Sequence, residues 1–182
     1  KAEMDSKRKD LLQNAGTLIA LVISIIAMVT SIYEANILKS QQKSMVWPYM
    51  SVGTSYSSSG FSATAFNNGT GPAIVKSMEV SIDDRPVENM LELIQGLMAG
   101  SELGYDVLFQ QKGNHYVFRP GEELEIIGFA WTDETRELAK LIHQRVRIRI
   151  GYESVLGDSW IYDSKEDTHT EGELKPKVDY KN

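Results

Sequence analysis

Residues 67–73 (NNGTGPA) have the composition of a loop that binds phosphate groups through its backbone amides. A phosphate-binding loop needs a Lys-Ser/Thr pair and a following helix, whereas here Pro72-Ala73 leads into a strand-like apolar run. The alternative is a strand–turn–strand connection in which Asn68-Gly69 adopt positive φ angles. We therefore interpret the segment as a structural turn formed by Asn68, Gly69, Gly71 and Pro72.

The side chains that bind metals or act as nucleophiles are few and scattered. His115, His143 and His169 form no H-x-x-x-H or H-E-x-x-H pattern, and the chain has no cysteine for a thiolate zinc site, a nucleophile or a disulfide. The acidic clusters lack the alternating ligand spacing of a calcium loop, and there is no G-x-S-x-G motif. We expect no catalytic residue, no metal site and no cofactor, and we predict that the protein is not an enzyme.

A row of arginines at positions 145, 147 and 149 alternates with apolar residues, which is the period of two that predicts a strand. Such a row suggests a site for phosphate or anionic lipid. The net charge of −6 favours a simpler interpretation, in which the arginines pair with carboxylates. If this strand and the strand predicted over 124–130 pair antiparallel, the arginine row lies across from Glu123 and Glu125. The acidic balance also argues against a nucleic-acid partner.

Strand signals continue through residues 47–163, and two stretches of helical periodicity interrupt them. The apolar spacing predicts helices over 87–98 and over 132–144. The predicted strands lie at 61–67, 74–82, 105–110, 115–119, 124–130, 146–152 and 160–163, with a first strand after Trp47. Glycine and aspartate at 157–158 predict a hairpin between the last two. This pattern predicts a mainly β domain, an immunoglobulin-like two-sheet sandwich with two short helical insertions.

Residues 11–33 contain no charged side chain and predict one N-terminal transmembrane helix. Its inner part, 15–33, would extend for about 28 Å, close to the thickness of the hydrocarbon core. A buried helix and a cleaved signal peptide are the alternatives, and we find no A-x-A-like cleavage site. Basic residues before the helix (Lys1, Lys7, Arg8, Lys9) outnumber those just after it (Lys39, Lys43). The positive-inside rule therefore predicts a cytoplasmic N-terminal tail, 1–10, in the inner membrane, and a periplasmic or extracellular domain. The alternative is a cytoplasmic domain.

Small residues recur along one face of this helix, at steps of three or four. They are Gly16, Ala20, Ser24, Ala27 and Ser31. Small side chains allow membrane helices to approach closely, so we predict helix packing with a second copy or with another membrane protein. Residues 34–46 lack Gly and Pro and predict a helical stalk that ends before Pro48. Residues 164–182 are polar and predict a flexible tail.

The Trp47-Pro48-Tyr49 start, the 67–73 turn and the late Arg-Ile-Gly-Tyr-Glu-Ser stretch (149–154) together define a pattern. In these features the chain resembles a diffuse group of small bacterial single-pass membrane proteins with one anchor, a Gln-rich stalk and a β-sandwich-like domain. The resemblance covers most of residues 11–163. It implies this architecture and brings no activity, cofactor or catalytic residue with it.

The sequence therefore predicts a function in protein–protein interaction. We predict an accessory or assembly subunit of a membrane complex, whose outer domain contacts another protein and whose helix contacts the lipid bilayer. The alternative is an envelope sensor or carrier that binds a small molecule or a polymer. Phe109, Tyr116 and Trp131 are the aromatic residues that would line its pocket.

Overall fold

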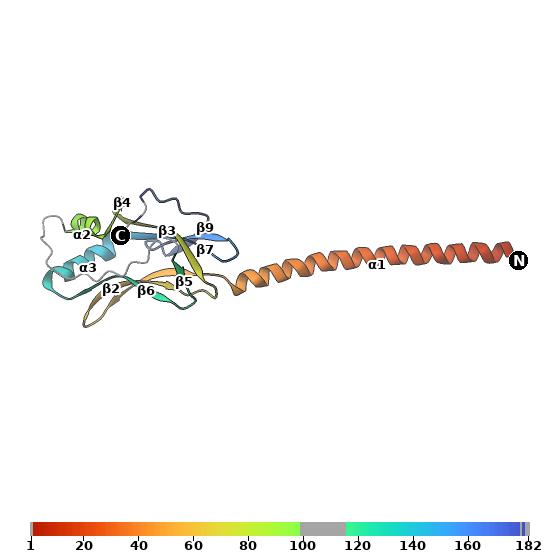
Figure 1. Cartoon of the computed structure of the whole chain (residues 1–182), viewed down its shortest axis with the longest axis horizontal. Coiled ribbons are helices and arrows are strands. Elements are labelled where there is room, and N and C mark those ends of the chain that lie inside the picture. Colours follow the sequence, from red (N-terminus) through yellow and green to blue (C-terminus); the bar gives the residue numbers. More distant parts are fainter. Residues whose placement is uncertain (1, 99–115, 179, 181–182) are drawn as a thin grey trace. The chain divides into compact units, whose positions relative to one another are not determined.

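The computed structural model describes residues 2–98, 116–178 and 180. The chain divides into two compact units, residues 1–44 and residues 45–182 (Figure 1). The first unit is helical, and the second holds all the strands and the two shorter helices. The predicted strand at 105–110 lies outside the described residues, as do His115 and Phe109.

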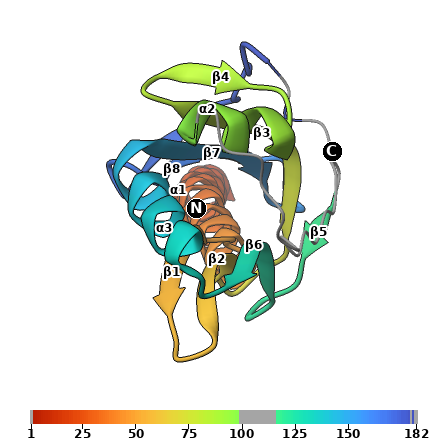
Figure 2. The same ribbon diagram turned by 90° about the vertical axis from the view of Figure 1, so that its left-hand side faces the viewer.

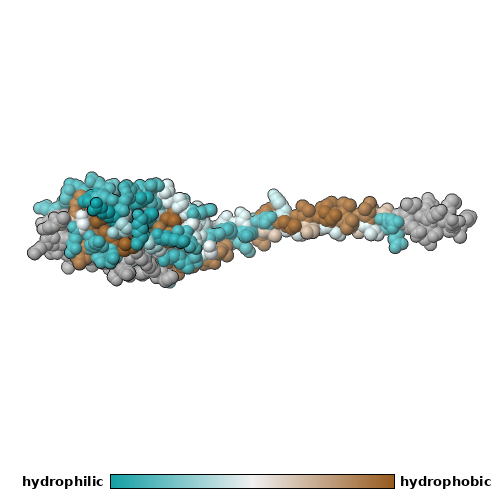
Figure 3. All heavy atoms as spheres, turned by 90° about the horizontal axis from the view of Figure 1, so that it is seen from above, coloured by the Kyte–Doolittle hydropathy of each residue, from teal (hydrophilic) through white to brown (hydrophobic). Residues whose placement is uncertain are grey.

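The long helix α1 (Ala2–Met45) has 44 residues. Its stretch Leu12–Met45 is long and apolar enough, by length and composition, to cross a membrane, and none of its apolar window is buried. Figure 3 shows these hydrophobic side chains gathered along the middle of α1. Within the apolar stretch the hydroxyls of Thr17, Ser24 and Thr30 each donate to the backbone carbonyl four residues earlier, at 2.8–3.0 Å. These three hydroxyls are thus bonded within the helix, as a nonpolar surrounding requires. The helix is of the kind that serves as a membrane anchor or a signal sequence.

The smaller of the two sheets in the domain contains β1 (Met50–Tyr56), β2 (Gly60–Asn67) and β6 (Glu123–Ala130), in the order β1-β2-β6. Both pairings are antiparallel. Along β2, Phe61, Ala63 and Ala65 are buried and alternate with half-buried residues. One face of this sheet therefore contributes to the hydrophobic core.

The larger sheet has six strands, and all its pairings are antiparallel. In chain order they are β3 (Ala73–Ile82), β4 (Arg85–Val87), β5 (Val117–Phe118), β7 (Val146–Glu153), β8 (Ser159–Asp163) and β9 (Thr168–Glu171). The central strand β3 pairs with β7 along one edge, and its other edge pairs with β5 near the start and β4 near the end. The hairpin predicted around residues 157–158 joins β7 to β8, and that prediction is confirmed.

Two short helices accompany the sheets. Helix α2 (Met90–Leu97) begins after Asn89, whose side chain accepts a hydrogen bond from the amide of Glu92. Helix α3 (Asp133–Arg145) begins after Thr132, which forms a reciprocal capping box with Thr135. Both helices lie at the same end of the domain, with α3 beside the space between the two sheets (Figures 1 and 2). Two antiparallel sheets and one long apolar N-terminal helix thus agree with the coarse prediction of a β-sandwich plus one helix.

Candidate functional site

The segment 67–72 connects the two sheets, because β2 belongs to the three-stranded sheet and β3 to the six-stranded one. Its first residue, Asn67, is fully buried. The side-chain oxygen Oδ1 of Asn67 accepts from the backbone amides of Tyr49 and Gly69, at 3.2 and 3.1 Å. Its amide nitrogen donates to the backbone oxygens of Gly71, Phe118 and Arg119, at 2.9–3.2 Å. One side chain thus satisfies backbone groups of three separate segments.

The glycines of this connection allow a close approach of two backbone segments, rather than the predicted turn with positive φ angles. Neither Asn68 nor Gly69 has a positive φ angle, so the prediction of a positive-φ turn at these two residues was wrong. Both Gly69 and Gly71 instead lie against the backbone of residues 46–49, and a Cβ atom on either would overlap with it. The amides of Thr70 and Gly71 also donate to the Trp47 carbonyl, at 2.9 and 3.1 Å. The connection therefore fixes the chain that enters the domain.

The arginine row lies on β7 and at the end of α3, and its partners differ from those predicted. Strand β7 pairs with β3 and β8, whereas Glu123 and Glu125 are on β6 in the other sheet. The prediction of pairing across to these glutamates was therefore wrong. Local alternation reveals which face the arginines share, but not which strand becomes the neighbour.

The carboxylates that do pair with the arginines come from β3, from the β3–β4 turn and from the region of β8. Arg145 contacts Asp83 at 2.5 Å, and Arg149 contacts Glu79, which is 2% exposed. Arg147 is bonded to Asp163 at 2.5 Å and also contacts Asp84 and Glu166, at 3.2 and 3.4 Å. These ion pairs occupy all three guanidinium groups, so the row is not an open anion site.

Asp163 has the most central carboxylate of this network. Burial acts to raise the pKa of Asp163, but the hydrogen bonds from Arg147 and from the Lys165 backbone outweigh it, so the pKa lies below the ordinary value of 3.8. The hydrogen bond from Arg145 similarly lowers the pKa of Asp83. Both carboxylates therefore remain charged at neutral pH and hold their arginines in place.

The C-terminal stretch differs from the predicted flexible tail. Strand β9 pairs with β8, and Leu174, Lys177 and Tyr180 of the following segment are bonded to β3. The Ser77 hydroxyl donates to the Leu174 carbonyl at 3.1 Å, the Lys177 amide donates to Glu79 at 2.7 Å, and the Tyr180 amide donates to the Met78 carbonyl at 3.1 Å. A Cβ on Gly151 would lie 2.7 Å from the Leu174 Cβ atom, which shows how closely this segment passes over β7. Composition alone predicted the tail, and it could not reveal these long-range bonds.

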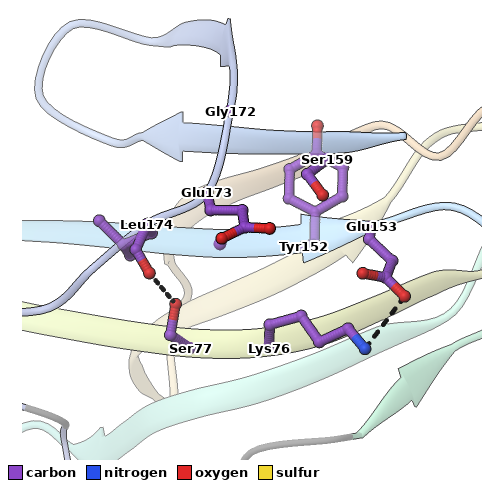
Figure 4. A pocket seen from close by; sticks show the side chains of 9 residues that line it. Lys76, Ser77, Tyr152, Glu153, Ser159, Gly172, Glu173 and Leu174 are labelled. Atoms are coloured by element: carbon purple, nitrogen blue, oxygen red, sulfur yellow. Dashed lines mark hydrogen bonds and ion pairs between the residues drawn. The ribbon is translucent and has the colours of Figure 1, made fainter. Parts of the chain in front are cut away.

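Beside this segment lies a hollow of about 320 Å³. Side chains of β3, β7 and β8 face it, together with Glu173 and Leu174 of the C-terminal segment (Figure 4). Its charged groups are Glu173 and the pair Lys76 and Glu153, which are 3.0 Å apart. The Ser77 hydroxyl is engaged with the backbone of Leu174 rather than with a base. The described residues that line this hollow provide no activated nucleophile.

The described histidines do not come together. His169 of β9 is stacked against Tyr49, with ring centroids 4.0 Å apart, and its Nε2 donates to the Met50 carbonyl at 2.6 Å. His143 is exposed near the end of α3. Among the residues that the structure describes, no group of three His, Cys, Asp or Glu is placed to hold a metal ion. His169 is a packing residue that ties β9 to the start of β1.

The aromatic residues predicted to line a shared pocket lie apart. Trp131 contacts Tyr56 and Phe129 and lies under the guanidinium of Arg136. Tyr116 contacts Phe118 and is hydrogen-bonded to Glu122. No ring contact between described residues joins Trp131 to Tyr116, so these two do not support the predicted pocket.

The five small residues of α1 are all exposed along the helix. The Ser24 hydroxyl donates within the helix to the Ala20 carbonyl at 2.8 Å. Sequence reasoning did not single out Asn67 and Glu79, two buried polar residues that bond separate segments of the domain. A signal for Asn67 existed, because it continues the period of two formed by Phe61, Ala63 and Ala65 on the buried face of β2.

The comparisons with known proteins leave the site to be interpreted from its geometry alone. No family model matches the chain, and neither does any curated protein or any solved structure.

Proposed function

We propose that this chain is a membrane-anchored, non-enzymatic protein whose β-domain mediates protein–protein contact, as an accessory or assembly subunit of a membrane complex. The observation that carries the proposal is the exposed apolar stretch of α1, which finds no partner within the described chain and needs a nonpolar surrounding. The proposed partners are the lipid bilayer and either a second copy of the chain or another membrane protein.

The junction between anchor and domain supports this role. The bonds of Asn67 and the close approach of Gly69 and Gly71 fix residues 46–49 within the domain. Residues 34–45 continue α1 without Gly or Pro for about 18 Å. A folded domain that follows a helical stalk in the chain is suited to contact a neighbouring protein outside the bilayer.

The finer aspects of the architecture are also proposals. We propose that the N-terminus lies in the cytoplasm of a cell with the domain on the other side of its inner membrane, on the basis of the basic residues before the helix. We propose an immunoglobulin-like type for the sandwich, supported by its two antiparallel sheets.

The small-residue face of α1 provides the test of association. Ala20→Leu together with Ser24→Leu places bulk on that face, and we expect weaker association of the full-length chain in native membranes, measured by crosslinking or by energy transfer between labelled copies. The matched control is Val22→Leu with Val29→Leu, which adds bulk to the opposite face. Unchanged association of the first variant, or equal loss in both, contradicts the role of this face.

A second candidate function is a sensor or carrier of small molecules in the cell envelope. A crevice of about 300 Å³ between the two sheets favours it. This candidate differs from the first in needing a ligand rather than a protein partner.

A further inference from the structure

The crevice opens between β1 of the smaller sheet and β7 of the larger sheet, next to the end of α3. Its inner wall is apolar and contains Ala63, Ile142 and Ile148, which are 2–6% exposed. Val52 and Val146, both half-buried, extend the same wall toward the surface. A volume of about 300 Å³ lies at the lower end of the range for small-molecule sites, about 300–1,000 Å³.

Two basic side chains, His143 and Lys165, stand at the mouth of the crevice and both are exposed. Most other basic groups of this region are paired: Arg145 with Asp83, Arg147 with Asp163, and Arg149 with Glu79. Within the described residues, no hydrogen bond or ion pair reaches the Lys165 ammonium or the His143 ring. Lys165 lies close enough to Asp83 to lower its pKa, but Asp83 is already bonded by two nitrogens of Arg145. The mouth therefore presents available positive charge.

We infer that this crevice binds a small amphipathic anion, a carboxylate or phosphate group on a short saturated chain. The apolar chain of the ligand lies against Ala63, Ile142 and Ile148. Binding is favourable there because the surface of the ligand's own chain leaves the water. The anionic group of the ligand lies at the Lys165 ammonium and the His143 ring. The inference concerns a site separate from the hollow beside the C-terminal segment, because the two share no lining residue.

Equilibrium dialysis of radiolabelled octanoate against the full-length protein in lipid nanodiscs tests this inference, with empty nanodiscs to subtract partition into lipid. We expect saturable binding of one octanoate per chain. Lys165→Gln removes the charge at the mouth and should weaken binding about fivefold, the effect of one partly exposed ion pair. The matched control is Lys175→Gln, an exposed lysine on the C-terminal segment, which should bind as the wild type does.

Competition with unlabelled ligands separates the contributions of chain and head group. If octyl phosphate competes better than octanoate, the site prefers phosphate head groups. If octanoate competes better, the site prefers carboxylates. Octanol competing as well as octanoate, or no saturable binding of either anion, overturns the inference. Ala63→Leu fills the apolar wall and should abolish binding, with circular dichroism to confirm that the variant folds. Where it does not fold, the comparison of Lys165→Gln with Lys175→Gln decides.

Discussion

At the scale of single residues, Asn67 bonds more separate segments than any other side chain described above. Replacing it with alanine takes a hydrogen-bond partner from two amides and three carbonyls in buried or partly buried places, of which the Arg119 carbonyl keeps the Glu122 amide. We expect Asn67→Ala to lower the free energy of unfolding by at least about 3 kcal/mol. The neighbouring Asn68 is exposed, and its side chain bonds only the Ser51 hydroxyl, at 2.8 Å, so Asn68→Ala should cost less than about 1 kcal/mol.

Urea denaturation of both variants, followed by circular dichroism, measures this difference. Similar losses for Asn67→Ala and Asn68→Ala would show that the buried bonds do not matter more than the exposed one.

Asp163 should make the stability of the domain depend on pH in the acidic range. Its pKa in the folded state lies below the ordinary value of 3.8, so its charge stabilises the fold at every pH above that value. This contribution is lost as the pH falls through the lowered folded-state pKa. We expect the melting temperature to fall between about pH 5 and about pH 3, and to fall less steeply in Asp163→Asn. The control Glu171→Gln removes an exposed carboxyl and should keep the wild-type slope. A parallel slope in Asp163→Asn contradicts the assignment.

The sequence revealed the role of a residue only where its interaction partners lie close to it in the chain. The alternation around Arg147 revealed a strand face, and the net charge correctly favoured ion pairs over an anion site. The partners themselves, Asp163 and Glu79, lie 16 and 70 residues from the arginines that they bind, and no local pattern identifies them. Lys165 and His143 likewise come together only because β7, α3 and the 164–165 loop meet in the fold.

At the scale of elements, the C-terminal segment is bonded to β3 and places Tyr180 in the hydrophobic core. Tyr180 is 6% exposed and belongs to the hydrophobic core, and burial raises the pKa of its phenol. We expect Tyr180→Ala to cost about 3 kcal/mol in unfolding free energy, as for other large buried aromatics. Lys175→Ala changes an exposed residue of the same segment and should stay within about 0.5 kcal/mol of the wild type. Equal stability of the two variants in a thermal melt would mean that the segment is not held against the sheet.

Elements with strong local signals were predicted closely. The apolar spacing and the caps placed α2 and α3 to within a few residues, and the alternation placed β2, β3, β6, β7 and β8. Residues 164–182 carried no apolar periodicity, so β9 and the segment after it were missed. Their order comes from backbone bonds to β8 and β3, which depend on tertiary structure rather than on local propensity.

At the scale of the whole molecule, the division into helix and domain was visible in the sequence because the two parts face different solvents. The stretch without charge up to Tyr33 suits a nonpolar surrounding, whereas the alternation beyond residue 47 suits a sheet with one face buried. The assignment of strands to two sheets was not visible, since it depends on which distant strands pair.

The orientation of the whole chain can be tested directly because it contains no cysteine. Single cysteines can therefore be labelled without background. Ser58→Cys places a thiol at the exposed turn between β1 and β2, and Ser6→Cys places one among the basic residues before the apolar stretch. If the basic residues hold the N-terminus in the cytoplasm, a membrane-impermeant maleimide should label Ser58→Cys in intact cells, or in spheroplasts where an outer membrane blocks access. Ser6→Cys should then react only after the inner membrane is permeabilised. The opposite pattern places the domain in the cytoplasm, and labelling of both sites in intact cells shows mixed orientation.

Replacing Lys7, Arg8 and Lys9 with glutamine should shift the pattern toward mixed labelling, because it removes the charge bias on which the predicted orientation rests.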